Sequence, residues 1–254
     1  MLNPQSEFME ILGIDIGGSG IKGAPVNVET GKQLEERFRI PTPQPSTPKA
    51  VANVIKKIVE HFNWHGPVGC GFPSIISHGK AMAHGNMDKS WVGVQVDELF
   101  SKKTGLDVTV VNDADAAGLA EMKYGVGRGK SGLVVMITIG TGIGSGVFYN
   151  GQLLPNFELG QLKYKNGKKI EKYAADSVRK KQDLSFTAWG KRFNEFLHHV
   201  NVICAPDYFI LGGGVSKKLD KFESEIDVEV PVLLAEFQNG AGIIGAAVSA
   251  NGIA

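Results

Sequence analysis

The sequence predicts an α/β protein with two lobes that face each other across a cleft. In each half of the chain, an apolar strand breaks at a glycine cluster and is followed by a second strand. Segments with the 3.6-residue period of a helix alternate with the strands in both halves. The length of 254 residues lies near the upper limit for one hydrophobic core and favours two closely joined domains.

The first half opens with strands joined by short turns, which usually lie antiparallel in one sheet. Strands are expected at 10–16, 22–28, 33–40, 68–72 and 107–111. The first helix is expected to be capped by Thr47, with Pro48 at its first position. Its apolar residues from Val51 to Phe62 recur at the spacing of one buried face. A second helix is expected at 96–104.

The second half repeats this order of elements. Strands are expected at 132–139, 145–149, 207–211 and 230–236, and helices at 169–181, 185–203 and 241–250. Aromatic residues lie along one side of helix 185–203, which indicates core packing and not a cofactor site. We place the first domain at 8–111, with the C-terminal helix 240–252 packing back onto it, and the second domain at 112–239.

Charge and cysteine content exclude several classes of protein. Lysine and arginine number 27 and acidic residues 26, so a net charge of +1 gives no reason to expect nucleic-acid or membrane partners. No segment reaches the roughly 18 apolar residues of a membrane-spanning helix, and the N-terminus lacks the features of a signal peptide. Cys70 and Cys204 are too few for a disulfide framework. We therefore expect a cytoplasmic protein.

Glycine is unusually abundant and is concentrated where strands end. The chain has 33 glycines among 254 residues, against an average of about 7%. Three clusters follow apolar strands: Gly17, Gly18 and Gly20; Gly140 and Gly142; and Gly212, Gly213 and Gly214. Bare backbone amides at such turns can approach an anion closely, and the Ser19 and Thr141 hydroxyls can donate to phosphate oxygens. The clusters predict phosphate binding without a Walker or Rossmann motif.

Two acidic positions stand at the ends of strands. Asp15 could hold Mg²⁺ through water beside the first glycine cluster, although an aspartate that caps its own turn is also compatible. Asn112 and Asp113 follow a strand at the edge where open α/β sheets bind ligands. One polar residue of Asn112, Asp113 and Asp115 is expected to cap the next helix. Asp113 could accept the proton of a substrate hydroxyl during attack on phosphorus.

A third polar group lies in the second half. Glu158 and Gln161 flank a glycine, and Glu171 follows 13 residues after Glu158. A carboxylate and an amide near a glycine suit the adjacent hydroxyls of a sugar, although a solvated turn is equally compatible. The loop that contains Asn86 also follows an apolar strand and could line the same pocket.

These motifs together resemble a known family. The strings DIGGSGIK, VVNDADAAGLAE, TIGTGIGSG, ELGQ and FILGGGVSK occur in this order in sugar kinases of the ROK family (repressor, open reading frame, kinase). The segments 71–91 and 112–125 resemble the polyphosphate glucokinase branch. The resemblance implies the two-lobed actin-like ATPase (ribonuclease H-like) fold, and transfer of a phosphoryl group from polyphosphate or ATP to the 6-hydroxyl of glucose.

The resemblance also implies roles for single residues. Asp113 would be the catalytic base, and the sugar would be bound by Asn112, Asp113, Glu158, Gln161, Glu171 and Asn86. The donor phosphates would be bound by Asp15, Gly17, Gly18, Ser19, Gly20, Lys22, Gly140, Thr141, Gly142, Gly212, Gly213 and Gly214. Mg²⁺ would be held at Asp15 through water, and a homodimer is expected.

The chain departs from the family pattern in two ways. Gln161 replaces the family histidine, and the cysteine-rich zinc loop of most members is absent, so no zinc site is expected. Two alternatives stay open: a kinase for another sugar (mannose, fructose or N-acetylglucosamine), and a non-catalytic sugar-sensing protein on the same scaffold. A basic track for polyphosphate could draw on residues such as Lys22, Lys89, Arg128, Lys130, Lys163, Lys165, Lys168 and Lys169, which are equally compatible with a solvated surface.

Overall fold

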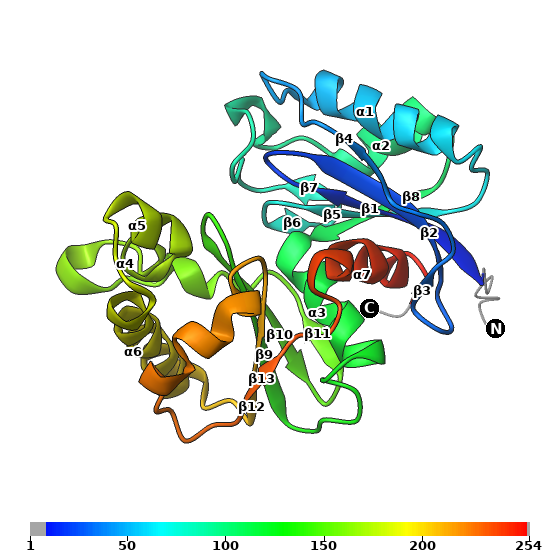
Figure 1. Ribbon diagram of the computed structural model, residues 1–254. Coiled ribbons are helices and arrows are strands. Elements are labelled where there is room, and N and C mark those ends of the chain that lie inside the picture. Colours follow the sequence, from blue (N-terminus) through cyan, green and yellow to red (C-terminus); the bar gives the residue numbers. More distant parts are fainter. Residues whose placement is uncertain (1–8, 253–254) are drawn as a thin grey trace. The chain divides into compact units, whose positions relative to one another are not determined.

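The structure is a computed structural model and describes residues 9–252 (Figure 1). The chain divides into two compact units. Unit 1 contains the residues up to Ala120 and those from Gly240 onward, and unit 2 is Glu121–Asn239. The first border falls within helix α3 (Asp113–Tyr124), and the C-terminal helix α7 (Ala241–Ser249) belongs to unit 1.

Unit 1 is built on a mixed sheet with the strand order β3-β2-β1-β5-β8, in which β4 also pairs with β2. The strands are β1 (Glu10–Ile16), β2 (Ile21–Asn27), β3 (Lys32–Gln33), β4 (Phe38–Ile40), β5 (Val68–Phe72) and β8 (Val108–Asn112). The pairs β1–β2, β2–β3 and β2–β4 are antiparallel, as predicted, whereas β1, β5 and β8 run parallel.

The expectation of one strand over 33–40 is wrong, because that segment forms the separate strands β3 and β4. Pro25 lies in the middle of β2, and its carbonyl accepts a hydrogen bond from Leu34 N (2.9 Å). The nitrogen of Pro25 faces the same side but carries no hydrogen, so the ladder to the third strand cannot continue there.

Helices cover both faces of the unit 1 sheet (Figure 1). Helices α1 (Pro48–His61) and α2 (Val96–Thr104) lie on one face, and α7 lies on the other. The predicted cap of α1 is confirmed, since Thr47 Oγ1 accepts a hydrogen bond from Ala50 N (3.4 Å). The short elements β6 (Ile76–Ser77), β7 (Lys80–Ala81) and η1 (Lys89–Trp91) lie between β5 and α2 in the chain.

Glycines bring α7 unusually close to the sheet. A Cβ atom on Gly13 of β1 would overlap the Ile243 carbonyl, and one on Gly69 of β5 would overlap the Ala246 carbonyl. On α7 itself, a Cβ on Gly245 would overlap the Ala116 carbonyl. Part of the glycine surplus therefore serves close helix packing, which the sequence did not predict.

Unit 2 repeats the topology of unit 1, as predicted. Its sheet has the order β11-β10-β9-β12-β13, with β9–β10 and β10–β11 antiparallel and β9, β12 and β13 parallel. The strands are β9 (Leu133–Ile139), β10 (Ile143–Tyr149), β11 (Gln152–Leu154), β12 (Tyr208–Gly212) and β13 (Val232–Leu234).

The helices of unit 2 are α4 (Glu171–Ala174), α5 (Asp176–Lys181) and α6 (Phe186–Cys204). The short helices are η2 (Leu159–Gln161), η3 (Lys165–Gly167), η4 (Ser216–Lys221), η5 (Glu223–Glu225) and η6 (Gln238–Gly240). The expected single helix over 169–181 is wrong: Ala175 is extended, and the Ala174 carbonyl accepts a hydrogen bond from Trp189 Nε1 (2.9 Å). A side chain of α6 thus takes the place of the next helical amide.

The aromatic residues of α6 are confirmed as core. Trp189, Phe193 and Phe196 are fully buried against the β9, β10 and β12 side chains. Within residues 9–252, no helix is both long and apolar enough to span a membrane.

Candidate active site

Asp15 and Asp113 lie at one edge of the unit 1 sheet. Strands β1, β5 and β8 run parallel, and their registers pair Asp15 with Gly71 and Gly71 with Val111. A Cβ on Gly71 would lie 3.6 Å from Asp113 Cα. The carboxyl ends of parallel strands meet at the same edge, which brings the proposed magnesium ligand and the proposed base to the same side of the sheet.

Of the three polar residues that the sequence offered as a cap for α3, Asn112 is one that takes this role. Its Oδ1 accepts hydrogen bonds from Ala114 N (2.8 Å) and Asp115 N (3.1 Å), and its Nδ2 donates to the Ser74 carbonyl (3.1 Å). The Asn112 side chain is only 5% exposed, whereas Asp113 is half-buried. These bonds fix the direction in which the first residue of α3 leaves the sheet, so Asn112 has a structural role beside any contact with a sugar.

The first glycine cluster forms a closed turn between β1 and β2. Gly17 N donates to the Gly20 carbonyl (3.1 Å), and the Thr42 hydroxyl donates to the Gly17 carbonyl (2.5 Å). Arg39 donates to the Ser19 carbonyl (2.8 Å). Arg39 and Thr42 were not singled out by the sequence, because they contact the turn only through the antiparallel pairing of β2 and β4 and the segment after it.

Asn86 lies beside this turn, since a Cβ on Gly18 would be 3.7 Å from Asn86 Cβ. The Asn86 side chain is exposed. The structure thus brings a residue predicted for the sugar and a glycine predicted for the donor to the same part of unit 1.

Asp15 already has a protein partner. Lys22 Nζ donates to Asp15 Oδ2 (2.8 Å) across the β1–β2 ladder, and 19% of the Asp15 side chain is exposed. Among the described residues, no group of three or more His, Cys, Asp or Glu side chains could hold a metal ion. A single carboxylate still fits Mg²⁺, which keeps most of its water ligands and is usually held by one or two carboxylates together with substrate phosphates.

The other two glycine clusters lie side by side in unit 2. Strands β9 and β12 are parallel neighbours, and a Cβ on Gly213 (φ 83°) would lie 2.5 Å from the Ile139 carbonyl oxygen. Gly140 and Gly214 face open space, where an added Cβ would meet no atom within 4 Å. Backbone amides in such an exposed, closely spaced pair of loops are suited to an anion with several phosphates.

Glu158 and Glu171 approach each other in the same unit. Burial and the neighbouring Glu171 carboxylate raise the pKa of Glu158, and Lys169 partly offsets the rise. A Cβ on Gly142 would lie 2.9 Å from Glu171 Oε2, so Glu171 also lies against the second glycine cluster. Gln161 is the last residue of η2 and is half-buried.

Ser145 positions the segment that carries Glu158. Its hydroxyl donates to the Phe157 carbonyl (2.5 Å) and accepts from Leu159 N (2.9 Å). Ser145 is 2% exposed and belongs to β10, so it fixes the residues on both sides of Glu158 to the sheet. Its position in a strand gave no local signal for this role.

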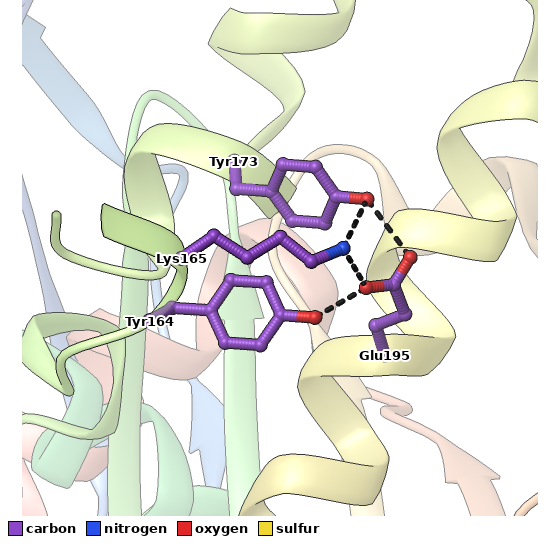
Figure 2. Close-up of polar contacts among 4 residues, drawn as sticks. All are labelled: Tyr164, Lys165, Tyr173 and Glu195. Atoms are coloured by element: carbon purple, nitrogen blue, oxygen red, sulfur yellow. Dashed lines mark hydrogen bonds and ion pairs between the residues drawn. The ribbon is translucent and has the colours of Figure 1, made fainter. Parts of the chain in front are cut away.

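Four polar side chains, which we call the Glu195 network, tie the segment around Glu171 to α6 (Figure 2). Glu195 accepts hydrogen bonds from Lys165 Nζ (2.7 Å), from the Tyr173 hydroxyl (2.8 Å) and from the Tyr164 hydroxyl. Burial opposes ionisation of Glu195, but these bonds outweigh it and lower its pKa. Because Tyr173 is two residues from Glu171, the network holds the proposed sugar ligand in place.

Glu195→Gln is expected to raise the KM for the sugar with little change in the KM for the donor. A neutral amide cannot replace a carboxylate that accepts three bonds, and a loss of about 1–2 kcal/mol corresponds to a factor of about 5–30. Steady-state kinetics and hydrogen exchange over 162–174 measure the effect. Lys165→Met is the matched control: it keeps both tyrosine bonds and should change the KM less than about twofold. Equal effects of the two variants would contradict the positioning role.

The pKa shift of Glu158 predicts an acid limb in sugar binding. As the pH falls through the raised pKa, Glu158 gains a proton and can no longer accept two hydroxyl bonds, so the KM for the sugar should rise at a higher pH than for an ordinary glutamate. Lys169→Gln should move this limb to still higher pH and raise the KM at its midpoint by about twofold. The control is Lys168→Gln, on the neighbouring exposed lysine. Coinciding pH profiles of the two variants would contradict the assignment.

Comparison with known proteins places this geometry in a family. The sequence model of the ROK family matches residues 11–155. The chain is 46% identical over 238 residues to a polyphosphate glucokinase of Mycobacterium tuberculosis, which covers 93% of this chain and 89% of that protein. The chain belongs to the ROK family. The resemblance found in its motifs is therefore confirmed over most of its length.

Two solved structures confirm the fold. The inorganic polyphosphate/ATP-glucomannokinase of Arthrobacter sp. strain KM matches with a TM-score of 0.91 and 42% identity, covering 95% of this chain and 98% of that one. A ROK family glucokinase from Streptomyces griseus, in complex with glucose and AMPPNP, matches with a TM-score of 0.81 and 23% identity over 96% of this chain and 99% of that one. The predicted actin-like ATPase fold of the family is thus correct.

Proposed function

We propose that this ROK protein transfers a phosphoryl group from polyphosphate or ATP to the 6-hydroxyl of glucose. Its similarity, over nearly its whole length, to a polyphosphate glucokinase and to a polyphosphate/ATP-glucomannokinase carries this proposal. The similarity to a glucomannokinase also favours mannose as a second acceptor for this protein. The retained aspartates and glycine clusters argue against a sugar-sensing protein without catalysis.

In the proposed reaction, Asp113 acts as the base. Its half-buried carboxylate, held at the start of α3 by the Asn112 cap, accepts the proton of the 6-hydroxyl as that oxygen forms a bond to phosphorus. The bond from phosphorus to the donor oxygen breaks, and the shortened donor leaves with its electron pair. The remaining hydroxyls form hydrogen bonds with Glu158, Gln161 and Glu171, and these bonds orient the sugar.

The donor phosphates would be bound by backbone amides of the three glycine clusters and by Lys22. When bound at Asp15 through water, Mg²⁺ would neutralise part of the donor charge. Lys22 holds the Asp15 carboxylate in position through its bond to Oδ2 (2.8 Å). We also expect a cytoplasmic protein that forms a homodimer. Sedimentation of the purified protein would test the dimer.

Initial rates with glucose and mannose, each against ATP and long-chain polyphosphate in the presence of Mg²⁺, test the proposal. Phosphorus NMR of the product distinguishes a 6-phosphate from other positions. Turnover with at least one pairing is expected, with glucose preferred. Fructose and N-acetylglucosamine serve as further acceptors, and absence of turnover with every pairing would leave only the sugar-sensing alternative.

A further inference from the structure

Three cations surround one aromatic ring in unit 2. The centroid of the Phe186 ring lies 4.2 Å from Arg179 Cζ, 5.6 Å from Lys218 Nζ and 5.6 Å from Lys221 Nζ. Phe186 is the first residue of α6, Arg179 belongs to α5, and both lysines belong to η4. We call these three cations the Phe186 cluster. They come from segments up to 42 residues apart, so no local pattern in the sequence indicated them.

The positive charge of the Phe186 cluster is only partly neutralised. Asp176 accepts from Arg179 Nε (2.6 Å) and also pairs with Lys180 Nζ (2.7 Å), so one carboxylate serves two cations. Within residues 9–252, neither Lys218 nor Lys221 has a carboxylate in ion-pair distance. Both lysines are exposed.

Acidic residues do occur in the same segment of chain. Asp220 lies between the two lysines, and Glu223 and Glu225 belong to η5, but none of them forms an ion pair with either lysine. At the protein surface a cation over an aromatic ring gains only about 0.5–1 kcal/mol. Like charges within a Debye length of about 8–10 Å repel one another. An anion that lies among the three cations would relieve this repulsion.

The Phe186 cluster is attached to both glycine loops of unit 2. Ser177, two residues before Arg179, donates its hydroxyl to the Thr141 carbonyl (2.5 Å). Ser216, two residues before Lys218, donates its hydroxyl to the Gly213 carbonyl (2.8 Å). The cations therefore belong to segments that are hydrogen-bonded to the two loops to which the proposed function assigns the donor phosphates.

We propose that the Phe186 cluster binds the phosphates of linear polyphosphate that extend beyond those held by the glycine loops. This inference rests on the proposed function and names the donor for which the site is built. Lysine and arginine are the side chains that bind phosphate oxygens best, and each further phosphate of a linear chain repeats the negative charge. None of the basic residues considered from the sequence belongs to the cluster; Lys165, for example, is bound to Glu195.

The surroundings of Phe186 favour a polyanion over the base of a nucleotide. The Arg179 guanidinium lies over the ring, and Phe222 stacks on it with a centroid distance of 6.3 Å. The ring is thus already covered by protein groups and offers a poor platform for a purine. ATP, whose phosphates end at a neutral nucleoside, should depend on the cluster much less than a long chain of phosphates does.

The double variant Lys218→Ala/Lys221→Ala tests the inference. The KM for long-chain polyphosphate should rise about tenfold or more, because two charged donors to phosphate are lost. The KM values for ATP and for tripolyphosphate should change less than about twofold, and the dependence of the polyphosphate KM on salt should become weaker. Both lysines are exposed and form no ion pair within the described residues, so the melting temperature should change by only a few degrees at most.

Lys57→Ala is the matched control. Like the two lysines of the cluster, Lys57 is exposed and forms no ion pair within the described residues, but it belongs to α1 in unit 1. The control should keep the polyphosphate KM of the unmodified protein. Equal polyphosphate KM values in the double variant and the control would overturn the inference and leave the proposed function intact. The same holds if the double variant raises the KM for ATP as much as the KM for polyphosphate. No turnover of polyphosphate by an unmodified protein that still uses ATP would overturn the inference alone, and no turnover with either donor would overturn both.

Discussion

Asp113→Asn is expected to lower kcat by about 10²- to 10⁴-fold, the usual contribution of a positioned general base. The amide has nearly the same shape as the carboxylate but cannot take the proton of the attacking hydroxyl. The backbone of Asp113 begins α3, and the cap that starts the helix comes from the Asn112 side chain, which the substitution leaves in place. The fold should therefore survive.

Single-turnover kinetics and calorimetric titration of glucose separate the lost step from lost binding. The dissociation constant for glucose should change only a few-fold, because a neutral amide can still bond to a hydroxyl. Asp107→Asn is the matched control, since this exposed aspartate immediately precedes β8, whose other end leads into Asp113. If Asp113→Asn keeps near-normal kcat, Asp113 is not the base.

Gly69→Ala is expected to destabilise unit 1 more than any exposed substitution does. A methyl group on Gly69 would overlap the backbone carbonyl of Ala246, which belongs to a helix and cannot move as a flexible side chain does. Forcing atoms into a well-packed contact typically costs about 1–3 kcal/mol, and contact with backbone lies at the upper end. For a chain of this size the melting temperature should fall by roughly 6–12 °C.

Thermal unfolding monitored by circular dichroism measures this effect, and Gly140→Ala provides the contrast. An added Cβ at Gly140 meets no atom within 4 Å, so the melting temperature of the Gly140→Ala variant should stay within about 1–2 °C of that of the unmodified protein. The same variant should raise the KM for the phosphoryl donor, because the open side of that loop is where phosphate would bind. An unchanged melting temperature for Gly69→Ala would mean that α7 can shift away from β5 at little cost.

Local patterns in the sequence were sufficient for most of the fold. β1, β5 and α2 have the predicted bounds, and α1 begins at Pro48 after the predicted cap. Two segments were wrong, 33–40 and 169–181. In each, the deciding contact comes from elsewhere in the chain: the missing amide hydrogen of Pro25 on the neighbouring strand, and the indole of Trp189 on α6. Periodicity cannot register such contacts.

The sequence by itself determined the family, the two repeated α/β units and the chemical types at the proposed site, because these reside in short motifs at strand ends. Only the tertiary structure decided which glycines leave open space and which allow close packing: Gly140 and Gly214 face open space, whereas Gly13 and Gly69 admit the backbone of α7. It also decided where positive charge gathers, since Arg179, Lys218 and Lys221 meet at Phe186. The physical reason is the same in both cases: steric overlap and Coulomb interaction depend on distance in space, and separation along the chain does not encode that distance.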